Sequence, residues 1–542
     1  MKKNQILFWL IIVIGALLRI WEIGSIPPGI HADEADLGYA AYSILHTGLS
    51  AYGTFNPLAF PEFNGGTHPP LYTLILVFLT KLFGMSIVVQ RLPSVLFGIA
   101  TVPVMYLLIK RLFGSKNTAL VGAALFAINP WSIFISRQGL HESIAVFFVT
   151  CGILFFLLAK TKHVFYILSA ICFGLSLHSY DAPKIFVPIF ILVLIVYQWK
   201  FIMKAKKYVV ASLLIFLFFS ILLLKTLFLD GQISDFNRIS SFDKSEISNA
   251  VNYERRMTTA PLWLSSIFHN KVTVIYKKYT SSFFRPFSTS WFFVDGHQNL
   301  LEAVGKQGQY YFFEMPFFFI GLLLAFRKDK KLGAVLLGWL LIGNIPGAIT
   351  KGDFYPYRSV LILPVPIIFS SLGIITFVQW VSKVTRFRLL ALGSIALICA
   401  FYVLSFLFTY FYDYPIYASE WRYKQRNEVL LYVEGIQSKY TYVFVNGDVE
   451  WAVMYAYLSK TDPRLFQKAY KNKQDYKGVE AIHIKKFYFA SFNAIKIATP
   501  SAFFPQNSLV VVDAGMFKDV QSLKTFHGAD PLNIIYKVLE IK

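Results

Sequence analysis

The chain has 542 residues, of which 56% are hydrophobic and only 15% are charged. Soluble domains are usually about 45–50% apolar and about 25% charged, so the composition excludes disordered, collagen-like and ordinary cytosolic proteins. Repeated apolar runs of spanning length instead predict a polytopic membrane protein. The net charge of +22 would suggest nucleic acid if the basic residues formed a stripe. They form short clusters between the apolar runs, as in membrane proteins, so we do not expect nucleic-acid binding.

Helices of spanning length are predicted from the apolar runs in chain order. These runs lie near residues 5–20, 92–109, 118–135, 143–159, 164–178, 185–199, 208–229, 311–326, 332–350, 359–381 and 389–411. The first run is followed by Arg19, Trp21 and Glu22 rather than by small residues, which favours a retained helix over a cleaved signal peptide. The fold class is therefore mainly α, with about 11 transmembrane helices.

One further apolar run, Leu71–Gly84, is short for crossing a bilayer and ends with Lys81 nearby. If this segment does not span, the basic clusters after the second, fourth, sixth, eighth and tenth runs fall on the same side as Lys2 and Lys3. The positive-inside bias makes that side the cytoplasm. We therefore interpret Leu71–Gly84 as a re-entrant or interfacial helix, with the N-terminus inside and the C-terminus outside.

This topology brings ionisable side chains from distant parts of the chain to the outer face. The first outer loop spans residues 24–90, and a large outer loop spans residues 230–310. The outer candidates are His31, Asp33, Glu34, His68, Arg137, His141, Glu142, Tyr180, Lys184 and Arg358. Any one of them also fits an interfacial anchor, but their recurrence in four outer loops favours a site.

The segment Asp33–Thr47 predicts an amphipathic helix on the membrane surface, ending at Gly48. Asp33 and Glu34 stand in its first turn, where the helix dipole stabilises negative charge. The alternative is that these acids only begin the helix. His68 precedes two prolines, which hold the entering chain extended and fix where the ring points. The alternative is a purely structural role, which is the commoner one for a lone histidine at an interface.

A series of short motifs resembles one superfamily of membrane enzymes. The motifs follow the order Asp33-Glu34, His68-Pro69-Pro70-Leu71-Tyr72, Lys81-Leu82-Phe83-Gly84, Arg91-Leu92-Pro93-Ser94, Arg111-Leu112-Phe113-Gly114, Asn129-Pro130 and Ser136-Arg137…Glu142, with a weaker match at Tyr357-Arg358…Leu363-Pro364. Their order and spacing resemble the bacterial relatives of dolichyl-phosphate-mannose protein mannosyltransferases and the lipid A aminoarabinose transferases. Both belong to the C-type (GT-C) membrane glycosyltransferases.

The resemblance implies a polyprenyl-phosphate sugar donor, inverting transfer on the outer face of a bacterial cell membrane, and an acid of the first loop as base. Asp33 matches that base best, with Glu34 as its catalytic neighbour. The sequence departs from the pattern at His31 and His141 and lacks the large luminal insertion of protein mannosyltransferases. A protein acceptor is therefore in doubt, and a lipid or glycan acceptor stays open.

The remaining candidates would bind substrate. Arg137 and Arg358 suit the leaving phosphate because the guanidinium is a permanently charged fork, with Lys184 behind them. Each also fits a snorkelling anchor. His68, Glu142 and Tyr180 complete the expected substrate-binding set. A phosphate leaving group does not strictly require a metal. His31, Asp33, His141 and Glu142 are nevertheless metal-ligand types, so a divalent cation stays open although their spacing matches no metal motif.

Two domains are expected, a transmembrane domain over residues 1–412 and a C-terminal extracytoplasmic α/β domain over residues 413–542. Strands are predicted at Tyr442–Val445, Leu509–Val512 and Ile534–Leu539, and a helix at Glu450–Leu458. The sequence as a whole predicts an integral-membrane inverting glycosyltransferase. The alternatives are a transporter or flippase of lipid-linked sugars and a non-catalytic membrane scaffold.

Overall fold

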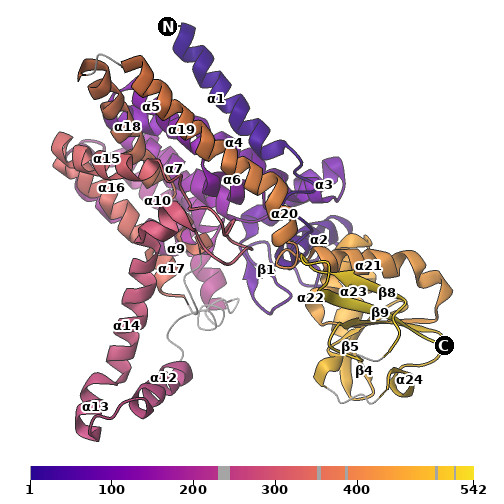
Figure 1. Ribbon diagram of the computed structural model, residues 1–542. Coiled ribbons are helices and arrows are strands. Elements are labelled where there is room, and N and C mark those ends of the chain that lie inside the picture. Colours follow the sequence, from indigo (N-terminus) through magenta and orange to yellow (C-terminus); the bar gives the residue numbers. More distant parts are fainter. Residues whose placement is uncertain (1, 230–243, 351–355, 385–387, 495–498, 518–519) are drawn as a thin grey trace. The chain divides into compact units, whose positions relative to one another are not determined.

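The computed structural model describes residues 2–229, 244–350, 356–384, 388–494, 499–517 and 520–542 (Figure 1). The chain forms two compact units, each assembled from separate segments. The first, which we call the helical unit, comprises Met1–Ile20, Ser94–Ser136 and His141–Leu407. The second, which we call the sheet unit, comprises Trp21–Pro93, Arg137–Leu140 and Phe408–Lys542.

A helix stands at every apolar run that the sequence predicts to be a span. These helices are α1 (Lys2–Ile20), α4 (Ile87–Phe113), α5 (Lys116–Ile128) with α6 (Pro130–Ser136), α7 (Glu142–Leu158), α8 (Phe165–Leu177), α9 (Asp181–Ile202), α10 (Lys206–Leu229), α15 (Glu314–Lys328), α16 (Lys330–Gly343) with α17 (Ile345–Ala348), α18 (Pro364–Val384) and α19 (Arg388–Phe408). Among the described residues, seven helices are long and apolar enough to cross a membrane, or eight if α5 and α6, bent by 55°, form one span. The mainly helical, polytopic fold class is thereby confirmed, whereas the number of eleven spans stays a prediction.

The large loop predicted at residues 230–310 contains helices of its own. These are α12 (Lys244–Arg256), α13 (Leu262–Phe268) and α14 (Lys271–Phe284), followed by the short helices η1 (Arg285–Phe287) and η2 (Ser290–Val294). Residues 230–243 of this loop lie outside the described residues. A further short helix, η3 (Pro356–Ile362), precedes α18 and packs against α7 and α9.

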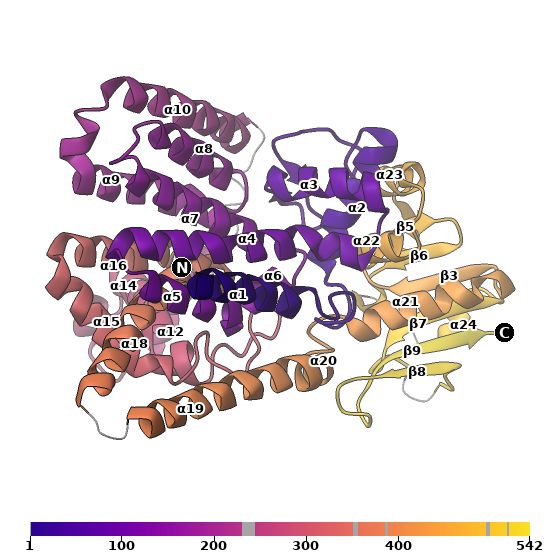
Figure 2. The same ribbon diagram turned by 90° about the horizontal axis from the view of Figure 1, so that it is seen from above.

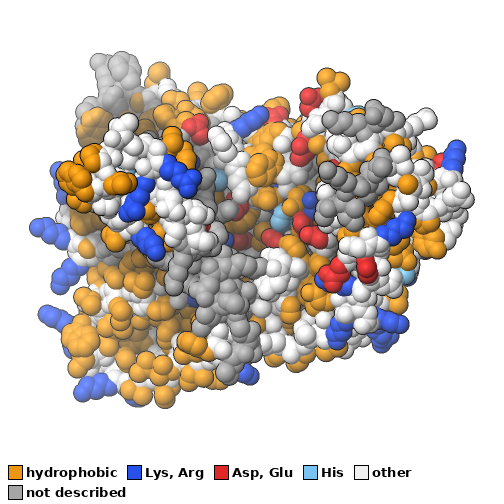
Figure 3. Space-filling model, turned by 90° about the horizontal axis from the view of Figure 1, so that it is seen from below, with side chains coloured by type: hydrophobic (Ala, Val, Ile, Leu, Met, Phe, Trp, Pro, Cys, Tyr) orange, Lys and Arg blue, Asp and Glu red, His pale blue; other side chains and the backbone are white. Residues whose placement is uncertain are grey.

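The basic side chains of the helical unit gather at the helix ends rather than along the helices. Figure 3 shows Lys and Arg along one edge of this unit and hydrophobic side chains over much of the remaining visible surface. Many large hydrophobic side chains are exposed on α1, α10 and α19, which fits contact with lipid. The pattern is that of a membrane-embedded bundle.

The sheet unit is built around a seven-stranded mixed sheet of order β4-β5-β6-β3-β7-β9-β8. The strands are β3 (Tyr442–Asn446), β4 (Gln474–Tyr476), β5 (Val479–Ile484), β6 (Phe487–Ala490), β7 (Ser508–Asp513), β8 (Lys524–His527) and β9 (Ile534–Ile541). Strand β3 pairs in parallel with β6 and β7, and the outer pairs are antiparallel. The three strands predicted from the sequence are all present.

Alternating side chains of the sheet enter two different hydrophobic cores. Val443 and Val445 of β3 belong to the core that also contains α2 (Ala32–Thr47), α21 (Lys424–Ile436), α22 (Val449–Leu458) and α23 (Pro463–Lys471), whereas Phe444 faces the other core. This alternation follows from the two-residue period of a strand. The short helices η4 (Thr409–Asp413), α20 (Tyr414–Tyr417), η5 (Gln437–Lys439), η6 (Phe492–Ala494) and α24 (Pro500–Phe503) complete the C-terminal part (Figure 2).

The first predicted outer loop is part of the sheet unit. It contains α2, a two-stranded hairpin of β1 (Phe60–Pro61) and β2 (Thr67–His68), and α3 (Pro70–Phe83). Helix α2 ends at Gly48 with a left-handed backbone (φ 72°), as predicted. Most of its circumference is buried against α3, α22 and α23, rather than a single apolar face. Helix α2 is thus a core helix of the unit that holds the sheet.

Candidate active site

The first turn of α2 places two acidic side chains in opposite surroundings. His31 is the N-cap, and its backbone N–H donates to Glu34 Oε2 at 3.1 Å, which closes a capping box. Glu34 is fully buried, whereas the Asp33 side chain keeps 40% of its exposure. The two carboxylates that the sequence grouped together therefore differ sharply in access to substrate.

Glu34 is held by groups from all three segments of the sheet unit. Arg91 Nε donates to Oε1 at 3.1 Å, and Arg422 Nη2 donates to Oε2 at 2.9 Å. The Gly139 backbone N–H donates to Oε1 at 2.7 Å. Burial by itself raises the pKa of Glu34, but the two guanidiniums outweigh it and lower the pKa to about 2. A carboxylate with so many donors is a poor proton acceptor. We call Glu34, Arg91 and Arg422 the buried clamp.

Asp33 stands beside the clamp in the same first turn of α2. Its Oδ2 lies 3.5 Å from His31 Nδ1, and its backbone N–H donates to the same nitrogen at 3.3 Å. The His31 ring stacks on Tyr423 with centroids 4.9 Å apart, which fixes its orientation. Asp33 therefore presents a partly exposed carboxylate from a rigid turn.

His68 connects two further acids in the same unit. Its Nε2 lies 3.2 Å from Asp36 Oδ2, and its Nδ1 lies 3.1 Å from Glu62 Oε1. Asp36 also accepts from the Tyr52 hydroxyl at 2.6 Å and the Phe63 backbone N–H at 3.2 Å. Burial by itself would lower the pKa of His68, but the negative charges of Glu62 and Asp36 outweigh burial and raise the pKa to about 9. The buried imidazolium ties the β1–β2 hairpin to α2.

Arg137 is fully buried in the sheet unit. Its Nη2 donates to the backbone oxygens of Trp21 at 2.6 Å and Ile26 at 3.0 Å. The guanidinium also lies 4.9 Å from the ring centroid of Phe411. Arg137 thus stabilises the segment before α2, and these contacts do not support the phosphate-binding role expected from the sequence.

The other predicted residues meet in the helical unit. Glu142 begins α7, and Asp181 begins α9, where its Oδ1 lies 2.6 Å from Lys184 Nζ. The rings of His141 and Tyr180 are nearly parallel with centroids 6.3 Å apart. Burial raises the pKa of Tyr180, and Glu142 raises it further, while Arg358 of η3 lowers it. Glu142, Tyr180, Lys184 and Arg358 therefore form one cluster at the starts of α7 and α9, which we call the helix-start cluster.

Two groups of predicted residues thus emerge, one in each unit. Asp33, Glu34, His68 and Arg137 belong to the sheet unit, and the helix-start cluster belongs to the helical unit. Sequence reasoning did not assign site roles to Arg91, Arg422 or Asp36. Arg91 stands in a motif and Asp36 follows Asp33 at helical spacing, but no sequence signal marks Arg422.

The candidate metal ligands do not form a metal site within the described part of the chain. No group of three or more His, Cys, Asp or Glu side chains is placed there to hold an ion. His31 and Asp33 lie in the sheet unit, while His141 and Glu142 lie in the helical unit. The three cysteines are free thiols.

Part of the chain matches a family model, and the fold resembles that of solved structures. Residues 67–224 match the family model of dolichyl-phosphate-mannose-protein mannosyltransferase, a segment that includes His68, Arg137, Glu142 and Lys184. No curated protein is detectably similar in sequence. The match covers less than half of the chain, and over that segment the chain is similar to the C-type (GT-C) membrane glycosyltransferases that the sequence analysis expected.

The fold likeness to ArnT from Cupriavidus metallidurans extends over nearly the whole chain. The apo structure covers 99% of this chain and 98% of ArnT, with 11% identity and a TM-score of 0.55. The structure bound to undecaprenyl phosphate covers 98% and 97%, with 12% identity and a TM-score of 0.52. The oligosaccharyltransferase of Archaeoglobus fulgidus covers 95% of this chain and 69% of its own, with 14% identity and a TM-score of 0.49.

Proposed function

We propose that this protein transfers a monosaccharide from a polyprenyl-phosphate donor to an acceptor hydroxyl on the extracytoplasmic face, with inversion at the sugar. The observation that carries the proposal is the pair at the start of α2: a buried carboxylate clamped by two arginines, beside a partly exposed one. The clamp fixes the turn, and the exposed neighbour remains available to substrate. ArnT, whose fold is similar, has been crystallised with undecaprenyl phosphate, which supports a lipid-phosphate donor.

In this reaction Asp33 is the general base and Glu34 is a positioning residue. The Asp33 carboxylate removes the proton from the acceptor hydroxyl as that oxygen bonds to the anomeric carbon. The bond from the anomeric carbon to the phosphate oxygen breaks, and the lipid phosphate leaves with the electron pair. Asp33 suits this part because it is partly exposed, whereas Glu34 has its lone pairs engaged by Arg91, Arg422 and Gly139.

Lys184 and Arg358 are the cations that we assign to the leaving phosphate. They lie in the helix-start cluster with Tyr180 and Glu142. Charge-assisted hydrogen bonds from such groups stabilise negative charge as it develops on an oxygen. Glu142 and Tyr180 would then orient sugar hydroxyls.

Complementation of cells that lack the protein tests this function. Mass spectrometry of glycans, glycolipids and glycoproteins should show a sugar increment that depends on the wild-type chain. Asp33→Asn should reduce that increment by about 10²-fold or more, the contribution of a positioned base, while Asp33→Glu should retain part of it. An unchanged increment in Asp33→Asn would remove Asp33 as the base, and no increment in wild-type cells would reject glycosyl transfer altogether.

Glu34→Gln provides the matched control, because it removes the adjacent charge by the same isosteric change. Breaking a buried ion pair from one side usually costs about 3–5 kcal/mol. Glu34→Gln should therefore lower the unfolding temperature of the purified protein, whereas Asp33→Asn should leave it nearly unchanged. If both variants destabilise equally, the division of labour between the two acids is wrong.

A further inference from the structure

An apolar groove lies among α7, α8, α9 and α10 of the helical unit, away from the helix-start cluster. Its cavity volume is about 290 Å³, close to the lower end of the ~300–1,000 Å³ of small-molecule pockets. Phe156 near the end of α7, Trp199 near the end of α9 and Val209 near the start of α10 line it. Glu142 and Asp181 stand at the opposite ends of α7 and α9. The groove is therefore a second, separate feature of this bundle.

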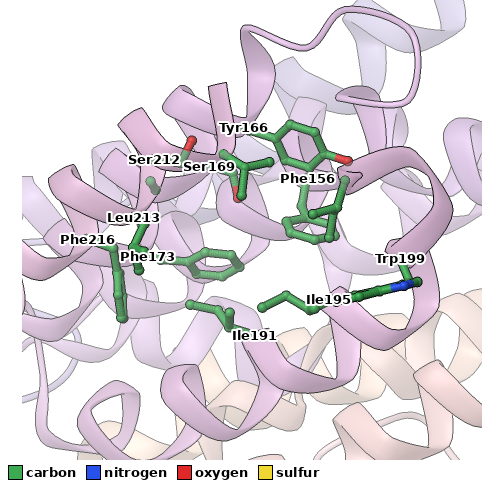
Figure 4. Close-up of a pocket in the computed structure, with 13 residues that line it drawn as sticks. Phe156, Tyr166, Ser169, Phe173, Ile191, Ile195, Trp199, Ser212, Leu213 and Phe216 are labelled. Atoms are coloured by element: carbon green, nitrogen blue, oxygen red, sulfur yellow. The ribbon is translucent and has the colours of Figure 1, made fainter. Parts of the chain in front are cut away.

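The walls of the groove have almost no polar groups to offer a ligand. Figure 4 shows Phe173, Ile191 and Phe216 around the cavity. The two serine hydroxyls of the lining donate to backbone oxygens: Ser169 Oγ to the Gly152 oxygen at 2.7 Å, and Ser212 Oγ to the Tyr208 oxygen at 2.7 Å. The third hydroxyl, of Tyr166, donates to Gln198 Oε1. Such walls suit a hydrocarbon chain rather than a sugar or a nucleotide.

A break in α9 shapes the end of the groove. Gln198 has a non-helical backbone (φ −112°, ψ 16°), and its side-chain amide donates to the Phe156 oxygen at 3.1 Å. The Tyr166 hydroxyl donates to Gln198 Oε1 at 3.4 Å. These bonds join α7, α8 and α9 where the helix bends, and Trp199 follows with 56% of its surface exposed. The exposed indole is typical of a membrane–water interface.

The groove ends at a strongly basic turn between α9 and α10. Residues 200–207, which we call the basic turn, contain four lysines and no acid, and all four side chains are exposed: Lys200, Lys204, Lys206 and Lys207. Between Glu142 and Asp230 the only acidic residue is Asp181, at the far end of α9. The α9–α10 connection lies at the left margin of Figure 2. A cationic cluster with no acid in its own turn thus stands beside the apolar cavity.

We propose that the groove and the basic turn form a binding site for an anionic glycerophospholipid. One acyl chain lies among α8, α9 and α10, and the phosphate of the head group meets the lysines of the basic turn. Charge complementarity selects the occupant, because basic pockets between transmembrane helices attract anionic head groups while the apolar walls accept any acyl chain. Only 6% of the spanning window of α10 is buried, and large hydrophobic side chains of this helix are exposed, so the lipid enters sideways from the bilayer.

Native mass spectrometry of the delipidated full-length protein tests this site. Dioleoyl phosphatidylglycerol should bind more tightly than dioleoyl phosphatidylcholine, which has the same chains and no net charge. Lys204→Gln with Lys206→Gln should weaken phosphatidylglycerol binding by roughly tenfold or more and abolish the preference. Lys3→Gln with Lys383→Gln, in α1 and α18, removes the same charge elsewhere and should leave the preference intact. Equal binding of both lipids to the wild type would overturn the proposal.

A groove-filling variant tests the acyl-chain half of the site. Ala170→Phe places a ring in the cavity and should weaken binding of both lipids, whereas Ala396→Phe on the exposed face of α19 should not. Undecaprenyl phosphate forms the third arm. If it displaces phosphatidylglycerol and its own binding is lost in Ala170→Phe, the groove holds a polyprenyl chain and the phospholipid proposal is wrong. Loss of phosphatidylglycerol in the lysine control pair would also reject it.

Discussion

Adjacent residues of like chemistry take different parts at the start of α2. Asp33 and Glu34 are both carboxylates in the first helical turn, where the dipole favours negative charge. One rotation of about 100° turns Glu34 into the core of the sheet unit and leaves Asp33 at its surface. The two acids therefore differ in the burial of their side chains and in the groups that bind them, not in residue type. This difference makes Glu34 the positioning residue and Asp33 the proposed base.

His68 should make the stability of the sheet unit depend on pH. Its pKa is raised from 6.5 to about 9 by Glu62 and Asp36. As the pH rises, the unfolded state therefore loses this proton at a lower pH than the folded state does. The stabilisation is fully present below pH 6.5 and is lost as the pH rises through about 9. The loss corresponds to about 3 kcal/mol. Unfolding temperatures measured from pH 6.5 to pH 9.5 should fall in the wild type and stay flatter in His68→Gln.

His527→Gln provides the control for this experiment. His527 is an exposed histidine of strand β8 in the same unit. Its replacement should leave the alkaline loss of stability in place. Parallel pH profiles for the wild type and His68→Gln would show that the buried imidazolium contributes nothing to the dependence.

The residue-level site was only partly predictable from the sequence. Asp33, Glu34 and His68 stand in motifs with recognisable spacing, so the sequence could single them out. Arg422 is 388 residues from Glu34, and the pairing depends on how the C-terminal segment folds back on α2. The burial of Arg137 has the same origin, because Phe411 and Tyr410, which its guanidinium contacts, come from the distant end of the chain. Local patterns carry no information about such partners.

At the scale of elements, the predictable features were those set by local periodicity. Apolar runs gave the positions of the helices, and β-branched and aromatic runs gave β3, β7 and β9. The surroundings of α2 were not predictable, because the α22 and α23 helices that cover it lie more than 400 residues further along the chain. An isolated helix of this composition looks amphipathic, and only the assembled unit buries the rest of its surface.

Gly38 should be required for the packing of α2 against α22. A Cβ atom there would lie 2.5 Å from Tyr457 Cε2 and 2.6 Å from Gln90 Oε1. Overpacking of this kind costs about 1–3 kcal/mol, which exceeds the gain in helix propensity from Gly to Ala. Gly38→Ala should therefore lower the unfolding temperature of the purified protein.

Gly435→Ala is the matched substitution, since Gly435 lies in α21 with no atom within 4 Å of the added Cβ. It should leave the unfolding temperature unchanged or raise it, because alanine favours the helix by up to ~1 kcal/mol. An equal response of both variants would mean that the close approach of α2 and α22 does not limit stability.

At the scale of the whole molecule, each unit is assembled from discontinuous segments. The sheet unit takes residues from the first predicted outer loop, from the short segment Arg137–Leu140 and from the C-terminal part. The buried clamp joins these three regions, because Arg91, Gly139 and Arg422 all bind Glu34. If the first loop and the C-terminal part share one unit, both must lie on the same side of the membrane. The eleven-span topology predicted from the basic clusters satisfies this condition.

The shorter helices decide whether that topology holds. Helices α7 and α8 have 17 and 13 residues, below the ~20 that a straight span needs. They follow each other as an antiparallel pair. Whether both cross the membrane or neither does, every later segment lies on the same side of the membrane in the two cases. Helix α15, with 15 residues, is single, and its omission would move Lys330 and the start of α16 across the membrane. The side on which residue 330 lies therefore tests the whole arrangement.

Labelling of introduced cysteines in intact cells measures this directly. Cys151, Cys172 and Cys399 are first replaced by serine, and single cysteines are introduced at the exposed positions Asn64, Lys330 and Gln506. A membrane-impermeant maleimide should label Asn64→Cys and Gln506→Cys from outside, because the first loop and the C-terminal sheet belong to one unit, which the proposed topology puts on the extracytoplasmic face. Lys330→Cys should react only after permeabilisation, since the positive-inside bias places its basic cluster in the cytoplasm.

Labelling of Lys330→Cys in intact cells would mean that α15 does not span. Opposite labelling of positions 64 and 506 would contradict a single sheet unit on the outer face, and with it the site proposed there.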